Sequence, residues 1–285
     1  MENLKALSYD LRRDVLEMVM RGHGGHIGGD MSVMDILITL YFKQMNCTPE
    51  NREDPDRDRF VLSKGHSVEA LYAVLAAKGF LDIREVIEQF SQFGSMYTGH
   101  PNNRLPGIEM NSGSLGHGLS VCVGMALAGK KDHRSYRVYT VMGDGELAEG
   151  SVWEGAMAAG HYRLDNLCAV VDRNRLQISG CTEDVMRQDD QRARWSGFGW
   201  HVIEAAGNDI EALNRAFEEA KQIRKMPSVI IANTVKGYGS GVMEGKAEWH
   251  HRVPTQEEYE QIIRDFQERK EAALREQDTQ QTSNM

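Results

Sequence analysis

Two stretches decide the fold: RVYTVMGDG at Arg137–Gly145 and LCAVVDRN at Leu167–Asn174. Each is a short apolar run that ends in glycine or polar residues, which is typical of a buried strand followed by a loop. The residues between them, 149–161, have the periodicity of a helix. A strand–helix–strand unit of this kind places its two strands parallel in one sheet.

The same alternation continues on both sides of this unit. Further strands and helices are expected at residues 60–63, 67–78, 118–128, 200–204, 210–224 and 228–234. Strands that are apolar throughout are buried on both faces. The sequence therefore predicts an α/β fold of three layers, a doubly wound parallel sheet covered by helices on both sides. Near the amino terminus, Ser32 and Asp35 have the spacing of a capping pair and predict a helix start.

The carboxy-terminal segment follows the sheet-forming part of the chain. We expect one domain over residues 1–254 and, over residues 255–285, a helix with a flexible tail. Thr255 and Glu258 form a capping box, and the charged helix that they open is expected to end near Arg275.

Composition excludes several classes of protein. The 285 residues carry 33 Lys+Arg and 42 Asp+Glu, a net charge of −9, whereas a nucleic-acid-binding protein usually has a basic face. The longest apolar runs are far shorter than the roughly 20 residues of a membrane span. The four cysteines have no regular spacing, and no secretory signal pattern is found at the amino terminus. A cytoplasmic location is expected.

Polar residues follow both deciding strands. Asp144 lies between two glycines after the first strand, and Asn174 follows the second strand 30 residues later. Ligands of open α/β sheets bind at the carboxyl ends of the strands, where these two side chains are expected side by side. Asp and Asn oxygens suit Mg²⁺, and the glycines allow a phosphate to approach the backbone. A simple turn is the alternative for an isolated GDG.

The pair of GDG and Asn174 resembles the thiamine diphosphate motif. Four further segments occur in order: Gly25-His26, Lys64-Gly65-His66, Gly99-His100-Pro101 and Gly113-Ser114-Leu115-Gly116-His117-Gly118. Together they resemble the amino-terminal half of transketolase, from about residue 7 to Pro254. The resemblance implies the diphosphate-binding domain of that family.

The resemblance implies a cofactor and a metal ion. Mg²⁺ is expected on the side chains of Asp144 and Asn174 and on the backbone carbonyl of Leu176. Thiamine diphosphate is expected to contact His66, Gly113, Ser114, Leu115, Gly143, Gly145, Asn174, Ile178 and His250.

The resemblance also implies catalytic residues: His26, His100, His250 and Glu149. Histidine suits proton transfer at sugar hydroxyls because its ordinary pKa is near 6.5. His251 remains the alternative to His250 for the diphosphate contact, since a shift of one residue is open.

The family's pyrimidine-binding domain has no counterpart after Pro254. We therefore expect a transketolase subunit completed by a separate carboxy-terminal, pyrimidine-domain chain in an α2β2 assembly. The reaction expected is transfer of a two-carbon ketol unit from a ketose phosphate to an aldose acceptor. The alternatives are a subunit similar to 1-deoxyxylulose-5-phosphate synthase, the α type of 2-oxo-acid dehydrogenase, or a non-catalytic paralogue. Which sugars serve as donor and acceptor stays open.

Overall fold

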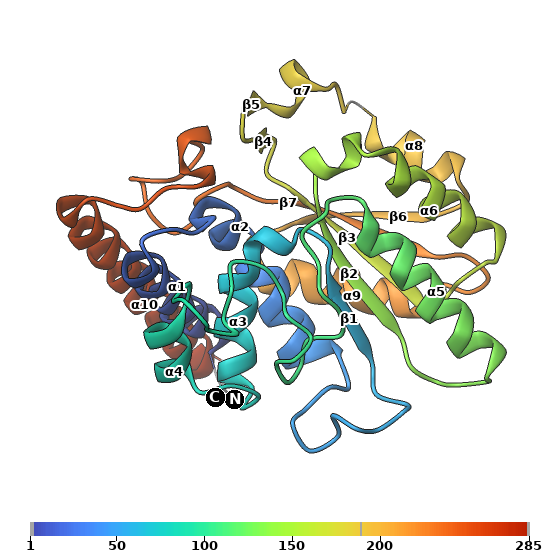
Figure 1. Ribbon diagram of the computed structural model, residues 1–285, viewed down its shortest axis with the longest axis horizontal. Helices are drawn as coiled ribbons and strands as arrows, with labels where there is room; N and C mark the ends of the chain where they lie inside the picture. Colours follow the sequence, from blue (N-terminus) through green and yellow to red (C-terminus); the bar gives the residue numbers. More distant parts are fainter. Residues whose placement is uncertain (1–2, 189, 284–285) are drawn as a thin grey trace.

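A five-stranded parallel sheet forms the middle layer of the protein (Figure 1). The computed structural model describes residues 3–188 and 190–283. The strands lie in the spatial order β1-β2-β3-β7-β6, with bounds Arg59–Leu62, Val138–Gly143, Leu167–Arg173, Ser228–Asn233 and His201–Ala206. The predicted α/β fold with a parallel sheet is confirmed.

The register of the strands brings their carboxyl ends to one edge. Gly143 of β2 pairs with Asp172 of β3, and Arg173 of β3 pairs with Asn233 of β7. The loops that follow these strands therefore start side by side, as expected for an open parallel sheet.

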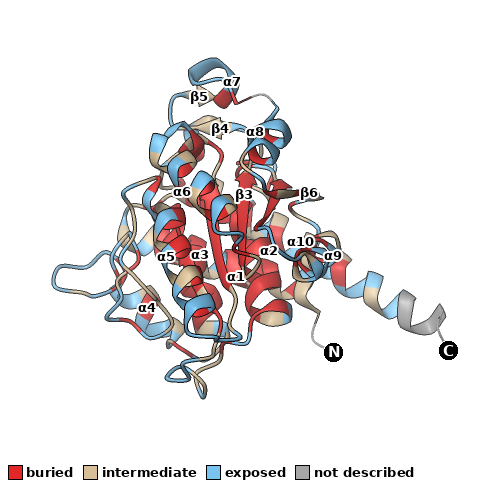
Figure 2. Cartoon of the chain, turned by 90° about the vertical axis from the view of Figure 1, so that its right-hand side faces the viewer, coloured by how far each residue is buried: buried red, intermediate tan, exposed pale blue. Residues whose placement is uncertain are grey.

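The sheet is apolar on both faces because successive residues of a strand point to opposite sides. In β3, Cys168 and Val170 belong to one core cluster and Ala169 and Val171 to the other. All four side chains are fully buried, and Figure 2 shows β3 in the colour of buried residues. This explains why the strands lack the polar alternation of a half-exposed sheet.

Helices cover both faces of the sheet. One core cluster joins the sheet to α1 (Leu4–Gly22), α2 (Ile27–Thr39), α3 (Val68–Ala77), α4 (Ile83–Gln89), α9 (Ile210–Gln222) and α10 (Gln256–Ser283). The other joins it to α5 (His117–Lys131), α6 (Gly150–His161) and α8 (Gln191–Gly197). A small hairpin, β4 (Leu176–Gln177) and β5 (Gly180–Cys181), precedes the short α7 (Thr182–Val185). Within the described ranges, none of the helices is both long and apolar enough to cross a membrane.

Helix α2 does not begin where the sequence suggested. The predicted start at Ser32 and Asp35 is wrong, because both residues lie inside a helix that begins at Ile27. The Ser32 hydroxyl donates to Asp172 of the sheet at 2.6 Å, and Asp35 forms a buried ion pair with Arg12 of α1 at 2.7 Å. Their polar side chains are therefore explained by tertiary contacts and not by capping.

The last helix is longer than predicted. Thr255 and Glu258 make the expected capping contacts, but α10 continues past Arg275 to Ser283. The added turns contain no glycine or proline that would end a helix. Ile262, Phe266 and Ala273 of α10 are buried, and the helix packs along α1. Residues 284–285 lie outside the described residues, so the flexible tail stays a prediction.

Two helical glycines allow a matched test of this packing. A Cβ at Gly160 of α6 would lie 1.9 Å from the Phe198 carbonyl oxygen, whereas a Cβ at Gly124 of α5 would meet open space. We expect Gly160→Ala to lower the free energy of unfolding by about 1–3 kcal/mol through overpacking. Gly124→Ala is expected to raise it by roughly 0.5–1 kcal/mol, because alanine loses less entropy in a helix. Urea denaturation of both variants checks this, and equal effects would contradict the packing of α6.

Candidate active site

The candidate site lies in the loops that follow the carboxyl ends of four neighbouring strands. Lys64 follows β1, Asp144 follows β2, Asn174 follows β3 and Lys236 follows β7. Asp144 and Asn174 therefore follow adjacent parallel strands, as the sequence predicted. The start of α2, which carries His26, completes the site from the helical layer.

Asp172, the penultimate residue of β3, is the centre of a buried polar network. Its carboxylate accepts hydrogen bonds from the Ser32 hydroxyl at 2.6 Å, the Lys64 ammonium at 2.6 Å and the Thr234 hydroxyl. Asp172 is fully buried and Lys64 is 1% exposed. A buried charge is stable only with such a partner and with its remaining lone pairs satisfied. The network thus joins α2 to the ends of β1, β3 and β7.

Three oxygen donors lie where the metal was predicted. Asp144 is 2% exposed, and its carboxylate accepts from the backbone N–H of Gly145 and of Arg175. The Asn174 Oδ1 accepts from the Leu176 N–H at 3.1 Å, which holds the amide against the Leu176 backbone. One carboxylate, one amide oxygen and one carbonyl are hard donors that fit Mg²⁺. Burial, with the nearby Asp172, raises the pKa of Asp144 to about 6, so a bound cation would favour its ionised form.

Lys236 is a cationic residue that the sequence did not single out. Its ammonium contacts the Leu176 carbonyl at 3.1 Å and the His250 Nδ1 at 3.2 Å. Burial and the charge of Lys64 lower the pKa of Lys236 to about 8. Because Lys64 is paired with Asp172, the Lys236 ammonium is the positive charge suited to a bound anion.

Four histidine rings gather around the ring of His26. The distances from its ring centroid are 5.1 Å to His66, 6.1 Å to His100, 5.6 Å to His250 and 4.6 Å to His251. The structure therefore brings together the four histidines that the sequence selected. His250 also lies 5.5 Å from His66 and touches Lys236, whereas His251 is next to Gly24.

Burial keeps these imidazoles neutral. It lowers the pKa of His26 to about 4 and that of His250 to about 3, with further contributions from His251 and Lys236 respectively. The pKa of His66 lies well below its usual range, because of burial and the charge of Lys64. Burial also lowers the pKa of His100. Neutral imidazole accepts a proton on one nitrogen and donates from the other, which is useful at a sugar hydroxyl.

The loop of residues 113–116 approaches these histidines closely. Gly113 has φ +139, and a Cβ there would lie 2.5 Å from the His100 Cδ2, so a larger side chain would displace the ring. The buried carboxylate of Glu146 accepts from the Gly116 N–H at 2.8 Å and from the Ser63 hydroxyl, which fixes the loop against β1. The sequence did not single out Glu146.

The remaining predicted residues lie at the rim. Ser114 is exposed and Leu115 half-buried. Glu149 is exposed at the start of α6 and packs next to Gly116. Ile178, in the turn of the small hairpin, is 70% exposed. Their contacts with cofactor, substrate or partner stay predictions.

Three residues that the sequence reasoning did not assign to the site share one signal. Lys64, Lys236 and Thr234 follow strand ends, just as Asp144 does. Applying the rule of the carboxyl edge to every strand, and not only to the GDG strand, would have found them. Ser32 carried no such signal, because its role depends on contact between distant segments.

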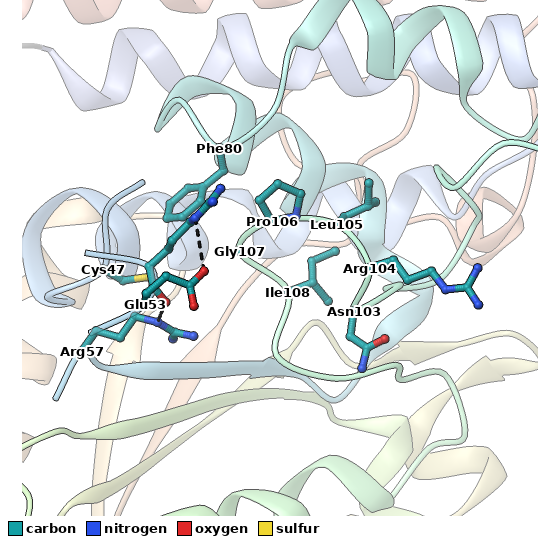
Figure 3. A pocket seen from close by; sticks show the side chains of 11 residues that line it. Cys47, Glu53, Arg57, Phe80, Asn103, Arg104, Leu105, Pro106, Gly107 and Ile108 are labelled. Carbon is teal, nitrogen blue, oxygen red and sulfur yellow. Dashed lines mark hydrogen bonds and ion pairs between the residues drawn. The ribbon is translucent and has the colours of Figure 1, made fainter. Parts of the chain in front are cut away.

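A cavity of about 300 Å³ lies apart from the site, beside the start of β1 (Figure 3). Two of its three arginines form ion pairs: Arg57 with Glu109 and Arg52 with Glu53. None of the predicted site residues belongs to its lining, which consists of Cys47, Arg52, Glu53, Arg57, Phe80 and residues 103–108.

Comparison with known proteins identifies the family. The model of the family described as transketolase, thiamine diphosphate binding domain, matches residues 5–278. The chain belongs to the transketolase family. It is a transketolase subunit that carries the thiamine diphosphate-binding domain, and hence a transferase.

Several transketolases are similar over nearly the whole chain. One subunit of the apulose-4-phosphate transketolase of Phocaeicola vulgatus is 50% identical, over 94% of this chain and 95% of that protein. The 6-deoxy-6-sulfo-D-fructose transketolase subunit of a Clostridium species is 41% identical, over 90% of this chain and 94% of that protein. Human transketolase is 39% identical over 93% of this chain, which spans 42% of the human protein.

Solved transketolase structures have the same fold. The enzyme of Campylobacter jejuni superposes with a TM-score of 0.87 and 31% identity, covering 95% of this chain and 43% of that one. The match supports the assignment of the parallel sheet and its flanking helices to the thiamine diphosphate-binding domain.

The lowered pKa values of the histidines predict a distinct titration. We expect the imidazole NMR signals of His26, His66 and His250 to remain those of the neutral form at about pH 5.5, whereas a histidine peptide is largely protonated there. Since the unfolded chain binds these protons first, stability is present above about pH 6.5 and is lost as the pH falls below it. Protonation of all three rings near pH 6.5 would contradict the buried cluster.

Proposed function

We propose that this transketolase subunit transfers a two-carbon ketol unit from a ketose phosphate to an aldose acceptor, with thiamine diphosphate and Mg²⁺. The observation that carries this is the grouping of three oxygen donors, two lysines and neutral histidines at one edge of the sheet. The first two sets suit a metal diphosphate, and the third suits proton exchange with a polyol.

The metal and the diphosphate are assigned to adjacent parts of the edge. Asp144, Asn174 and the Leu176 carbonyl would hold Mg²⁺, because these donors are hard oxygens. Gly145, His66 and His250 would contact the diphosphate, together with Lys236. His250 is preferred over His251 because it touches Lys236 and lies near His66. The segment Gly113–Leu115 would line the aminopyrimidine.

Substrate chemistry is assigned to the other side of the cluster. When bound, thiamine diphosphate supplies the nucleophilic carbon and the electron sink for cleaving a carbon–carbon bond of a ketose. His26 and His100 would then accept or return protons at the sugar hydroxyls. Burial keeps His26 neutral at physiological pH, so one ring nitrogen can accept a hydrogen bond from a sugar hydroxyl while the other can donate one.

A second chain would complete this site. The relatives that are named as transketolase subunits have nearly the same length as this chain, whereas full-length transketolases are more than twice as long. We infer a carboxy-terminal, pyrimidine-domain partner and an α2β2 assembly. Glu149, exposed beside the Gly113–Gly116 loop, would face that partner.

The donor is proposed as a class. Two relatives are named for apulose 4-phosphate and one for 6-deoxy-6-sulfo-D-fructose, all ketoses. Apulose 4-phosphate is the first donor to test, given 50% identity. We place the protein in the cytoplasm, because all four cysteines are free thiols and three of them are buried.

Activity on mixing tests the proposed function. This chain alone, with thiamine diphosphate and Mg²⁺, is expected to show no ketol transfer, since half of the site is absent. Adding a pyrimidine-domain subunit is expected to produce activity that saturates near a one-to-one ratio. Substantial activity without a partner would contradict the two-chain assignment. Association and cofactor binding without transfer to any acceptor would indicate a non-catalytic paralogue.

Substitution of Asp144 tests the metal site. Asp144→Asn keeps the side-chain volume but removes the charge, so Mg²⁺-dependent affinity for thiamine diphosphate is expected to fall by at least about tenfold. Calorimetry on the two-chain complex measures this affinity, with Asp132→Asn on the surface after α5 as the control. Unchanged affinity in Asp144→Asn would remove Asp144 from the metal site.

Two histidine variants test the division of roles. His66→Ala is expected to weaken thiamine diphosphate binding, because His66 lies on the diphosphate side with His250. His100→Ala is expected to lower kcat with little change in cofactor affinity, because its proposed contacts form at the reacting hydroxyls. Steady-state kinetics and cofactor titration of each variant separate the two effects. The same pattern in both variants would refute the division.

A further inference from the structure

Two carboxylic acids, Asp30 and Glu69, are fully buried beside the histidine cluster. Asp30 lies in the first turn of α2 and Glu69 in the first turn of α3. The charge of Asp30 helps to raise the pKa of Glu69, so the two carboxyl groups lie close together. Buried acids are uncommon without a cation or a metal ion, so this pair requires an explanation.

Each acid binds the start of the other's helix. The Asp30 Oδ1 accepts from the Ala70 N–H in the first turn of α3 at 3.0 Å. The Glu69 Oε1 accepts from the His26 N–H, at the start of α2, at 3.2 Å. First-turn N–H groups have no partner within their own helix, and neither His26 nor Ser67 caps its helix with a side chain. The pair therefore acts as a capping box shared between two helices.

The second oxygen of each acid identifies a shared proton. Asp30 Oδ2 and Glu69 Oε2 are buried, and no N–H or O–H of the described residues donates to them. An ionised carboxylate can only accept, so two ionised groups would leave both oxygens without a donor. One proton between them makes a carboxylic O–H that donates to a carboxylate, which satisfies both.

The surrounding charges decide which acid keeps the proton. Burial and the charge of Asp30 raise the pKa of Glu69 well above its usual range. Burial also raises the pKa of Asp30, but its bond to Ala70 and the charge of Lys64 oppose this. Glu69 therefore carries the proton and Asp30 the negative charge.

Other elements near the pair supply no ion pair to it in residues 3–188 and 190–283. Helix α1 presents Val19, whose Cγ2 lies against Gly25 together with the Glu69 Oε1. The buried Arg12 of α1 is bound to Asp35, and the Lys64 ammonium is bound to Asp172. The shared proton is thus the means by which the pair avoids a second buried charge.

We propose that Asp30 and Glu69 are positioning residues that share one proton and hold His26 and His66 in register. His26 is the residue before α2, and His66 lies in the turn before α3, so joining the two helix starts fixes the 5.1 Å between the rings. The proposal rests on the proposed function only for the role of the two histidines. Loss of the shared proton at alkaline pH would loosen both helix starts.

Thermal unfolding of the full chain tests the shared proton without any substrate. In Glu69→Gln, the amide N–H donates to Asp30 at every pH and the amide oxygen still accepts from His26. In the wild type, the shared proton stabilises the fold fully below about pH 4.5, and this stabilisation is lost as the pH rises toward the raised pKa of Glu69. The melting temperature of Glu69→Gln is therefore expected to rise relative to wild type between about pH 5 and about pH 9. Glu88→Gln, exposed on α4, is the control and is expected to follow the wild type.

Kinetics of the two-chain enzyme test the positioning role. Glu69→Gln is expected to keep kcat/KM within about twofold at neutral pH and to extend the alkaline limb of the pH profile. Glu69→Leu, which loses both contacts, is expected to lower kcat/KM by about tenfold or more.

Parallel melting curves for wild type and Glu69→Gln would overturn the shared proton, whether or not Glu69→Leu folds. A Glu69→Leu enzyme with wild-type kinetics would overturn the positioning role. Inactivity of the wild-type complex would count against the proposed function alone, since the melting curves still test whether Asp30 and Glu69 share a proton.

Discussion

The carboxyl edge of the sheet depends on one buried ion pair, between Asp172 and Lys64. The carboxylate lies at the end of β3, the lysine follows β1, and Ser32 of α2 and Thr234 after β7 donate to the same two oxygens. Removing one partner of a buried ion pair typically costs about 3–5 kcal/mol of stability. The contacts of Asp172 therefore fix the positions of the four segments that meet at this edge. Of the proposed metal donors, Asn174 follows β3 itself and Asp144 follows the neighbouring β2, so both lie beside this network. The fold and the site are thus stabilised by the same contacts.

Burial gives the lysines and the histidines of this edge different electrostatic roles. Low dielectric opposes charge on every group, and the histidines respond by staying neutral. Lys64 is charged because Asp172 is its counter-charge, whereas the Lys236 ammonium contacts a carbonyl and an imidazole and can attract an anion. The acids of the neighbouring helices respond differently, since Glu69 retains a proton and thereby adds no second charge. One region therefore holds fixed positive charge, neutral proton acceptors and a bound proton within the starts of two helices and the ends of four strands.

Sequence reasoning predicted the sheet and brought together most residues of the candidate site for physical reasons. Continuous apolar strands such as Leu167–Val171 can only be buried on both faces, and the residues after them must meet at one edge. It failed where a side chain acts on a distant segment. Ser32 has the local pattern of a helix cap, but its hydroxyl is used by Asp172, 140 residues away. Glu69 shows no local pattern at all, because its role depends on which helices pack together.

The measurement that tests the central claim most directly is the stability of Asp172→Asn. This variant keeps the shape of the side chain and leaves the Lys64 ammonium buried without a counter-charge. The account predicts a loss of about 3–5 kcal/mol in the free energy of unfolding by urea, with weaker thiamine diphosphate binding by the two-chain enzyme. Glu204→Gln, in an exposed pair with Arg192, is the control and should cost less than about 1 kcal/mol. A loss below about 1 kcal/mol in Asp172→Asn, with unchanged cofactor affinity, would contradict the claim that this pair organises the site.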